Sequence, residues 1–133
     1  MRVSDEGASA PVIVATPAPE EAAEAAAWAD RSRRVLTRDL LVRARHARPG
    51  ERRALEFRVL HLNLVLVTEV TERLGVTRAE CRRLEHHALE ALHEAVQRYD
   101  PYDEPDFAEV AGVLIEERLR PRLLRLSVVT SPV

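Results

Sequence analysis

The chain has few of the residue types on which several common folds and sites depend. Its single cysteine, Cys81, excludes an internal disulfide framework and a zinc site built from several cysteines. Four glycines and the lack of any Asn-Gly or Asp-Gly step argue against a sandwich of tight β-hairpins. The longest uncharged stretch in the middle of the chain, 59–68, is about half as long as a membrane span. These shortages favour a helical protein without a transmembrane segment.

The chain nevertheless has enough apolar residues to fold. Hydrophobic residues make up 46% and charged residues 32% of its 133 residues, which is typical of a globular domain. Aromatic residues are only 4%, so we expect a core made mainly of leucine, valine and alanine. Arg2 is followed by Asp5 and Glu6 and then by only a short apolar run, which does not fit a secretory signal. We therefore expect a soluble, cytoplasmic protein.

Charge is distributed unevenly along the chain. All 20 basic residues are arginine. The net charge is −4 over residues 1–27, +6 over 28–60, −8 over 61–117 and +4 over 118–133. Segments of alternating net charge favour docking to charged partners over general binding to nucleic acid. Each block could also be the solvated face of a helix.

Start and stop signals divide the chain into helices. Pro19, followed by early acidic residues, begins one helix, and Thr37 is placed to cap a separate short one. A capping box of Thr77 and Glu80 opens a later helix, and Gly75 just before it favours a left-handed helix end. The expected helices cover 19–35, 38–47, 51–74, 78–99 and 107–120.

These signals predict an all-α fold, a compact bundle of four to five helices over residues 19–125. We expect a disordered leader over 1–18 and a loose C-terminal tail over 126–133. Pro121 should end or kink the last helix, and the apolar segment 62–67 should lie at the centre of the bundle. The core expected from helical spacing consists of Phe57, Leu60, Leu64, Leu84, Leu92, Tyr99 and Ile115.

Candidate chemical groups are few. His86, Glu90 and His93 share one helix face and could hold zinc or iron, but such a site needs ligands from a second element, so we expect no metal or other cofactor. Cys81 lies in a first helical turn beside two arginines, which would favour a thiolate, but we expect a buried, inert thiol. No glycine-rich phosphate loop, nucleophile elbow or His-Glu-x-x-His motif is present. We therefore expect no enzyme activity and no small-molecule substrate.

Two groups of arginines have alternative interpretations. The first could contact phosphates, or could be a solvated helix surface beside neighbouring acidic residues. The second is spaced for one helix face and could contact phosphates or stabilise the negative end of a helix. The first group comprises Arg31, Arg33, Arg34, Arg38, Arg43, Arg45 and Arg48, and the second comprises Arg118, Arg122 and Arg125.

The order of segments over about 35–125 resembles the start of bacterial sigma factors of the sigma-70 family, in particular the stress and sporulation branch of actinobacteria. The strongest local match is 91–101, Ala-Leu-His-Glu-Ala-Val-Gln-Arg-Tyr-Asp-Pro, which is similar to the family's Gly-Leu-x-x-Ala-Val-x-Arg-Phe-Asp-Pro. Phe107, Ala111 and Ile115 keep the family's spacing without a gap. The resemblance implies the region 1.2 and region 2 part of a sigma factor, a helical domain that binds the RNA polymerase clamp and opens promoter DNA.

The chain departs from the family pattern at positions where the family places function. The family's Asp-Leu-x-Gln-x-Gly, whose polar residues contact the clamp, reads Arg83-Leu84-Glu85-His86-His87-Ala88 here. Val110 stands where the family commonly has tyrosine, and the same helix is rich in glutamate, which repels phosphates. Phe107 is expected in the core. No segment resembles regions 3 and 4, so we expect a degenerate sigma-like protein that keeps the scaffold without the DNA-reading surface.

The resulting hypothesis is a sigma-like transcription regulator that acts by protein contact, on an anti-sigma factor or on the RNA polymerase clamp, without melting promoters. One alternative is a divergent sigma factor fragment that still binds RNA polymerase and promoter DNA, and another is an unrelated helical adaptor or small metal-binding bundle. The predicted partner-binding residues are Arg82, Arg83, His86, His87, Glu90 and His93. The residues with a predicted phosphate or partner contact are Arg31, Arg34, Arg38, Arg45, Arg118 and Arg122.

Overall fold

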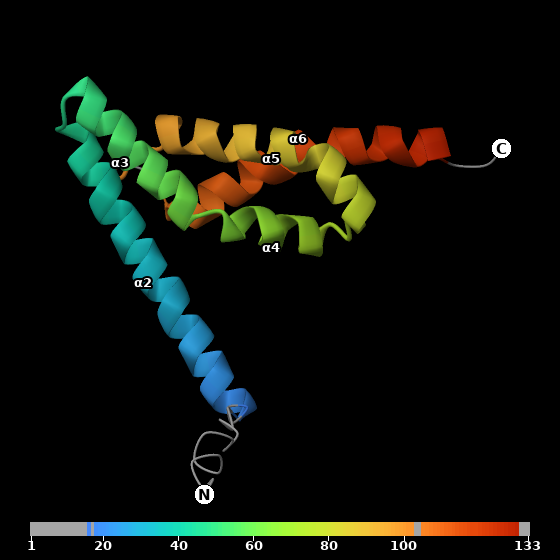
Figure 1. Cartoon of the computed structure of the whole chain (residues 1–133), viewed down its shortest axis with the longest axis horizontal. Coiled ribbons are helices and arrows are strands. Elements are labelled where there is room, and N and C mark those ends of the chain that lie inside the picture. Colours follow the sequence, from blue (N-terminus) through green and yellow to red (C-terminus); the bar gives the residue numbers. More distant parts are fainter. Residues whose placement is uncertain (1–15, 17, 103–104, 131–133) are drawn as a thin grey trace, which may run out of the picture.

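The computed structural model describes residues 16, 18–102 and 105–130, with the backbone alone over 126–130. These residues form five helices and no strand, which confirms the predicted all-α class. Figure 1 shows that α2 and α3 form one antiparallel pair and that α4, α5 and α6 lie together beside it. The helices are α2 (Pro19–Arg45), α3 (Pro49–Leu62), α4 (Val65–Arg73), α5 (Arg78–Arg98) and α6 (Phe107–Thr130). No helix in this part of the chain is both long enough and apolar enough to cross a membrane.

The core is aliphatic and centres on α5. This helix packs most extensively against α6, while α2 packs against α3, and α4 contacts both α5 and α6. Leu84, Leu92, Tyr99 and Ile115 are buried as predicted. Leu60 is only half-buried at the edge of the same cluster. The other buried apolar residues are Leu40, Leu41, Ala44, Leu55, Val59, Leu66, Val70, Ala88, Ala91, Ala95, Val96, Phe107, Ala111 and Leu119.

Local signals fix most helix ends as predicted. The Thr77 hydroxyl accepts from the Glu80 amide at 3.1 Å and the Glu80 carboxylate accepts from the Thr77 amide at 2.9 Å, so the capping box is present. The hydrogen bond from the Thr77 backbone amide, and after it the contact with the Thr77 side chain, lower the pKa of Glu80 below its ordinary value of 4.5. Gly75, at φ +70°, adopts the left-handed conformation that glycine tolerates best. Asp106 accepts from the Ala108 amide at 3.0 Å and begins α6.

The predicted division of the first helical region is wrong. Instead of two helices meeting at Thr37, α2 is continuous over 27 residues, and Thr37 is 1% exposed in its interior. Its hydroxyl does not cap a helix but accepts a hydrogen bond from Asn63 Nδ2 at 2.9 Å. A threonine hydroxyl can cap locally or bond to a distant group, and here the long-range partner determines the outcome.

The predicted helix over 51–74 is interrupted. Asn63 and Leu64 separate α3 from α4, and the Asn63 side chain donates to the Val59 carbonyl, which the Asn63 amide also contacts. A side-chain bond to the preceding turn competes with regular helix geometry. The apolar face that is buried runs through Leu55 and Val59, so Phe57 and Leu64 are exposed by 52% and 40% instead of lying in the core. The prediction that segment 62–67 lies at the bundle centre therefore holds only for its buried members, Asn63 and Leu66.

The last helix is longer than predicted. α6 continues through Pro121 to Thr130, so the loose tail expected from residue 126 is helical over 126–130, and 131–133 lie outside the described residues. Proline removes the amide that would bond to the Glu117 carbonyl. The next carbonyl along the helix, that of Arg118, accepts from the Arg122 side chain at 2.8 Å, which supplies a local polar contact. The predicted leader, 1–18, also falls almost wholly outside the described residues.

Candidate functional site

Helix α5 presents two distinct faces. Leu84, Ala88 and Leu92 are buried on the inner face, and the same 3.6-residue period places the predicted partner-binding residues on the opposite side. All of these outer residues are exposed except His87, which is half-buried. We call Arg82, Arg83, His86, His87, Glu90 and His93 the α5 outer face.

Ionic contacts are concentrated at one part of the α5 outer face. Glu90 lies 3.5 Å from His86 Nε2 and 3.5 Å from His87 Nδ1, and Arg118 of α6 approaches it at 3.9 Å. Arg118 also contacts Glu94 at 3.4 Å, so this residue of the predicted phosphate or partner set links α6 to α5. The histidines strengthen their contacts with Glu90 only when they are protonated.

Arg82 and Arg83 differ from the rest of this face. Both side chains are exposed, and neither makes an ion pair within 4.0 Å with any residue that the structure describes. They occupy the first turns of α5, which the capping box holds in place. Two guanidinium groups on a rigid helix are suited to bidentate binding of a partner's carboxylates.

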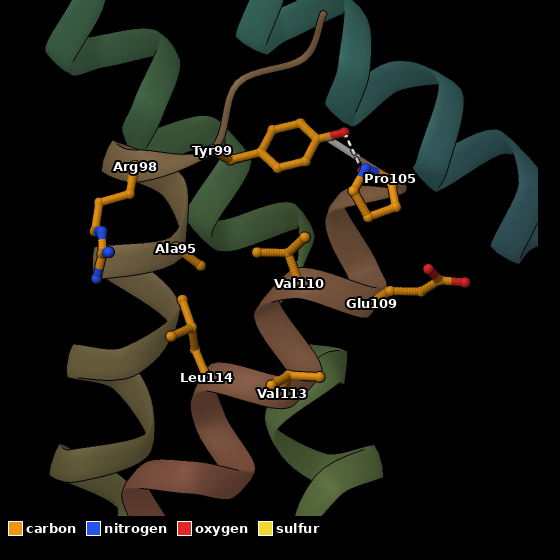
Figure 2. A pocket seen from close by; sticks show the side chains of 8 residues that line it. All are labelled: Ala95, Arg98, Tyr99, Pro105, Glu109, Val110, Val113 and Leu114. Carbon is orange, nitrogen blue, oxygen red and sulfur yellow. Dashed lines mark hydrogen bonds between the residues drawn. The ribbon is translucent and has the colours of Figure 1, made fainter. Parts of the chain in front are cut away.

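An apolar cleft lies between the end of α5 and the start of α6 (Figure 2). Its volume is about 410 Å³, and Val110 and Leu114 extend into the space below Tyr99. Tyr99 closes one end because its hydroxyl donates to the Pro105 carbonyl at 2.7 Å. The cleft could accept an apolar side chain of a bound protein. Its lining residues are Ala95, Arg98, Tyr99, Pro105, Glu109, Val110, Val113 and Leu114.

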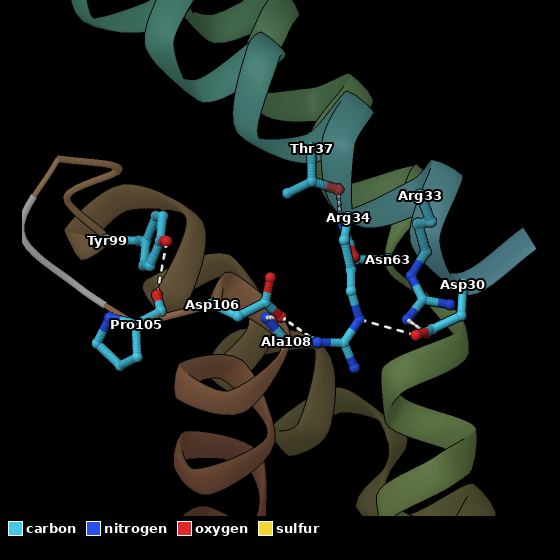
Figure 3. Close-up of polar contacts among 9 residues, drawn as sticks. All are labelled: Asp30, Arg33, Arg34, Thr37, Asn63, Tyr99, Pro105, Asp106 and Ala108. Atoms are coloured by element: carbon cyan, nitrogen blue, oxygen red, sulfur yellow. Dashed lines mark hydrogen bonds and ion pairs between the residues drawn. The ribbon is translucent and has the colours of Figure 1, made fainter. Parts of the chain in front are cut away.

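Two arginines of the predicted basic stretch connect α2 to the α5–α6 connection. Arg34 lies between two carboxylates, 2.8 Å from Asp30 and 2.8 Å from Asp106 (Figure 3). Further along α2, Arg45 contacts Asp100 at 3.0 Å. Because both charges are paired with carboxylates within the chain, these two arginines fit the alternative of a helix surface beside acidic residues better than phosphate contact.

The other arginines of that stretch have mixed surroundings. Arg33 contacts Asp30 at 2.7 Å, whereas Arg31, Arg38, Arg43 and Arg48 are exposed and make no ion pair with any described residue. In the C-terminal group, Arg122 is half-buried and bonds to a backbone carbonyl. Arg31 and Arg38 are therefore the members of the predicted contact set whose charge remains available.

The side chains described on α6 include no exposed aromatic residue on which the bases of a single-stranded nucleic acid could stack. Phe107, the one aromatic residue over 107–125, is 4% exposed and packs edge-to-face on Tyr99 with ring centroids 5.4 Å apart, so it is in the core as predicted. Glu116 binds Arg120 at 2.6 Å and Arg73 at 3.0 Å, and these bonds lower its pKa below the ordinary value of 4.5. Glu109 and Glu117 are exposed, and the same part of α6 also carries four arginines, Arg118, Arg120, Arg122 and Arg125. Stacking on exposed aromatics and neutralisation of phosphates are the usual basis of such binding.

The remaining candidate groups show no reactive arrangement. Cys81 is half-buried, whereas the prediction from the sequence was a buried thiol. Among the described residues, no group of three or more His, Cys, Asp and Glu side chains is placed to hold a metal ion.

Sequence reasoning missed the Thr37–Asn63 and Arg34–Asp106 contacts, which join residues far apart in the chain. The one available signal was polarity, since Asn63 interrupts an otherwise apolar run.

Comparison of the chain with protein-family models, curated proteins and solved structures gives no significant match.

Proposed function

We propose that this protein is a sigma-like transcription regulator that acts by protein contact through the α5 outer face, without melting promoter DNA. The observation that carries the proposal is the pair of exposed arginines, Arg82 and Arg83, which have no ion-pair partner within the described part of the chain. The resemblance of the sequence to sigma region 2 supplies the candidate partners, the RNA polymerase clamp and an anti-sigma factor.

The substitutions relative to the sigma pattern favour protein contact over DNA contact. An arginine at position 83, where the family has aspartate, reverses the charge offered to a partner, so the partner surface must carry complementary carboxylates. Because Phe107 is buried, the described side chains of α6 include no exposed aromatic residue on which the bases of a melted strand could stack. An anti-sigma factor that recognises the shape of the bundle is therefore a better match than promoter DNA.

The decisive variant is Arg83→Glu. If Arg83 pairs with a carboxylate that becomes buried on binding, reversing its charge should weaken binding by about 2 kcal/mol or more, which is roughly 30-fold in Kd. Binding isotherms against purified RNA polymerase core enzyme and against purified anti-sigma factors of actinobacteria would measure this effect.

Two control variants separate partner recognition from charge and stability. Arg53→Glu makes the same charge change at an exposed arginine of α3 and should leave the Kd unchanged. Leu84→Ala should lower the free energy of unfolding by about 2–5 kcal/mol through a core cavity, while Arg83→Glu should leave the melting temperature nearly unchanged. Wild-type affinity in Arg83→Glu would contradict the proposed surface, as would equal weakening by Arg53→Glu.

Nucleic acid provides a test of the main alternative. Fluorescence anisotropy with a bubble-shaped promoter probe over a salt series should give no sequence-dependent binding. Sub-micromolar, sequence-dependent binding would favour a divergent sigma fragment that still contacts promoters. Failure to bind polymerase, anti-sigma factors and promoter DNA would favour an unrelated helical adaptor.

A further inference from the structure

The N-terminal half of α2 extends away from the rest of the bundle (Figure 1). Every residue from Pro19 to Ala29 is exposed, whereas burial by other helices begins further along α2. Alanines give this segment a high intrinsic helix propensity, and Pro19 with early glutamates suits a helix start. A rigid helix therefore presents its side chains without a partner in the chain.

One side of this helix carries a regular stripe. Its members recur at alternating intervals of three and four residues, the spacing by which two helices pack along a seam. Trp28 and Val35 supply exposed apolar surface, with 66% and 62% of each residue exposed. We call Glu21, Glu24, Trp28, Arg31, Val35 and Arg38 the α2 outer stripe.

The stripe faces away from the protein's own core. Leu40 and Leu41 mark the side of α2 that packs on the bundle, and the helical period places the stripe on the opposite side. A shallow groove runs along it beside Glu24, Trp28 and Arg31. A second helix lying there would therefore not collide with the body of this protein.

Charge along the α2 outer stripe is ordered. The N-terminal part is acidic, at Glu21 and Glu24, and the C-terminal part is basic, at Arg31 and Arg38. None of these four residues makes an ion pair with a residue that the structure describes. Glu24 and Arg31 lie on either side of Trp28, so reversing the helix about a point beside Trp28 exchanges an acidic position for a basic one.

From this arrangement we propose that α2 binds α2 of a second copy, antiparallel, about a two-fold axis beside Trp28, through Glu24, Trp28 and Arg31 of the α2 outer stripe. An axis between Ala27 and Trp28 places Glu24 of each copy opposite Arg31 of the other. It also places the Trp28 ring over Ala27 of the other copy, where a small side chain leaves space for it. A parallel pair would instead place like charges together, which is unfavourable.

The contact is of moderate size. Antiparallel overlap of residues 19–36 gives a helix pair about 27 Å long at 1.5 Å per residue. The buried surface is small compared with that of an obligate dimer, so we expect reversible, concentration-dependent association. The α5 outer face takes no part, so this inference does not depend on the proposed function.

The chain has a single tryptophan, and it lies at the centre of the proposed contact. Intrinsic tryptophan fluorescence therefore reports on this surface alone. In a dilution series of the full chain, we expect the emission maximum to shift to shorter wavelength and iodide quenching to fall as the concentration rises. Sedimentation velocity over the same series should show conversion from monomer to dimer.

Charge reversal tests the antiparallel arrangement directly. Glu24→Arg and Arg31→Glu should each weaken dimerisation by about tenfold or more, because each places like charges together on both sides of the two-fold axis. An equimolar mixture of these two variants should form heterodimers about as well as wild type self-associates, since opposite charges then face one another on both sides of the axis. The double variant Glu24→Arg with Arg31→Glu should also recover self-association.

Control variants identify specific failures. Arg53→Glu on α3 and Arg83→Glu on α5 change charge elsewhere and should leave dimerisation unchanged. A wild-type chain that remains monomeric up to about 1 mM overturns the proposal, as does a dimer that neither single reversal weakens. A dimer weakened by both reversals but not restored in their mixture overturns the antiparallel arrangement. Circular dichroism of each variant confirms that α2 still folds.

Discussion

The hydrogen bond between Thr37 and Asn63 is the most informative contact to perturb. Asn63 is 2% exposed, and its Nδ2 donates to the Thr37 hydroxyl at 2.9 Å and to the Val59 carbonyl at 2.8 Å. The first bond joins the interior of α2 to the break between α3 and α4. In Figure 3 the Thr37 and Asn63 side chains point toward one another between these elements.

Thr37→Val removes the acceptor while nearly preserving the side-chain shape. One Asn63 N–H then remains buried without its partner, and an orphaned buried donor costs about 1–3 kcal/mol. A loss of 1 kcal/mol lowers the melting temperature by about 4–8 °C in a domain of 60–100 residues. We expect a shift of that order with little change in helical content below the transition.

A double-mutant cycle separates the bond from packing. Asn63→Leu alone should also destabilise the fold, because it leaves the Thr37 hydroxyl buried without its donor. The double variant should lose less than the sum of the two single losses, since neither polar group then remains unsatisfied. Thermal and urea unfolding of all four proteins give the required free energies. A neutral Thr37→Val, or strictly additive losses, would refute the argument.

Two further predictions concern exposed carboxylates and caps. Thr77→Ala should lower the free energy of unfolding by about 1 kcal/mol, because the Glu80 amide loses its acceptor, and urea denaturation would measure the change. The pKa of Glu116 is lowered in the folded chain, so its bonds to Arg120 and Arg73 stabilise the fold above pH 4.5 and are lost as the pH falls through the folded pKa. Glu116→Gln should therefore show a shallower loss of stability in a pH series spanning 4.5, and an identical profile to wild type would contradict this assignment.

Several elements of the fold could be read directly from neighbouring residues. The capping box of Thr77 and Glu80, the left-handed Gly75 and the helix start at Pro19 are all local, because their hydrogen bonds and steric limits involve residues within one turn. The inner and outer faces of α5 could be predicted in the same way, because its apolar residues follow one helical period without interruption.

Which face of the helix over 49–62 is buried could not be predicted in this way. Phe57, Leu60 and Leu64 satisfy the helical period as well as Leu55 and Val59 do, so periodicity alone permits either face to be buried. Packing of α3 against α2 and α5 selects the second set. The error therefore arose where two local solutions were nearly equivalent.

By itself, the sequence determined the helical class, most helix ends and the residues of the α5 outer face, because each depends on contacts within a few residues. Only the tertiary structure decided that Thr37 lies inside a helix and that Arg34 and Arg45 are used internally. Their partners, Asn63, Asp106 and Asp100, are distant in the chain and approach only when the helices pack. A polar side chain has the same local options in either case, and the fold selects among them by supplying the partner.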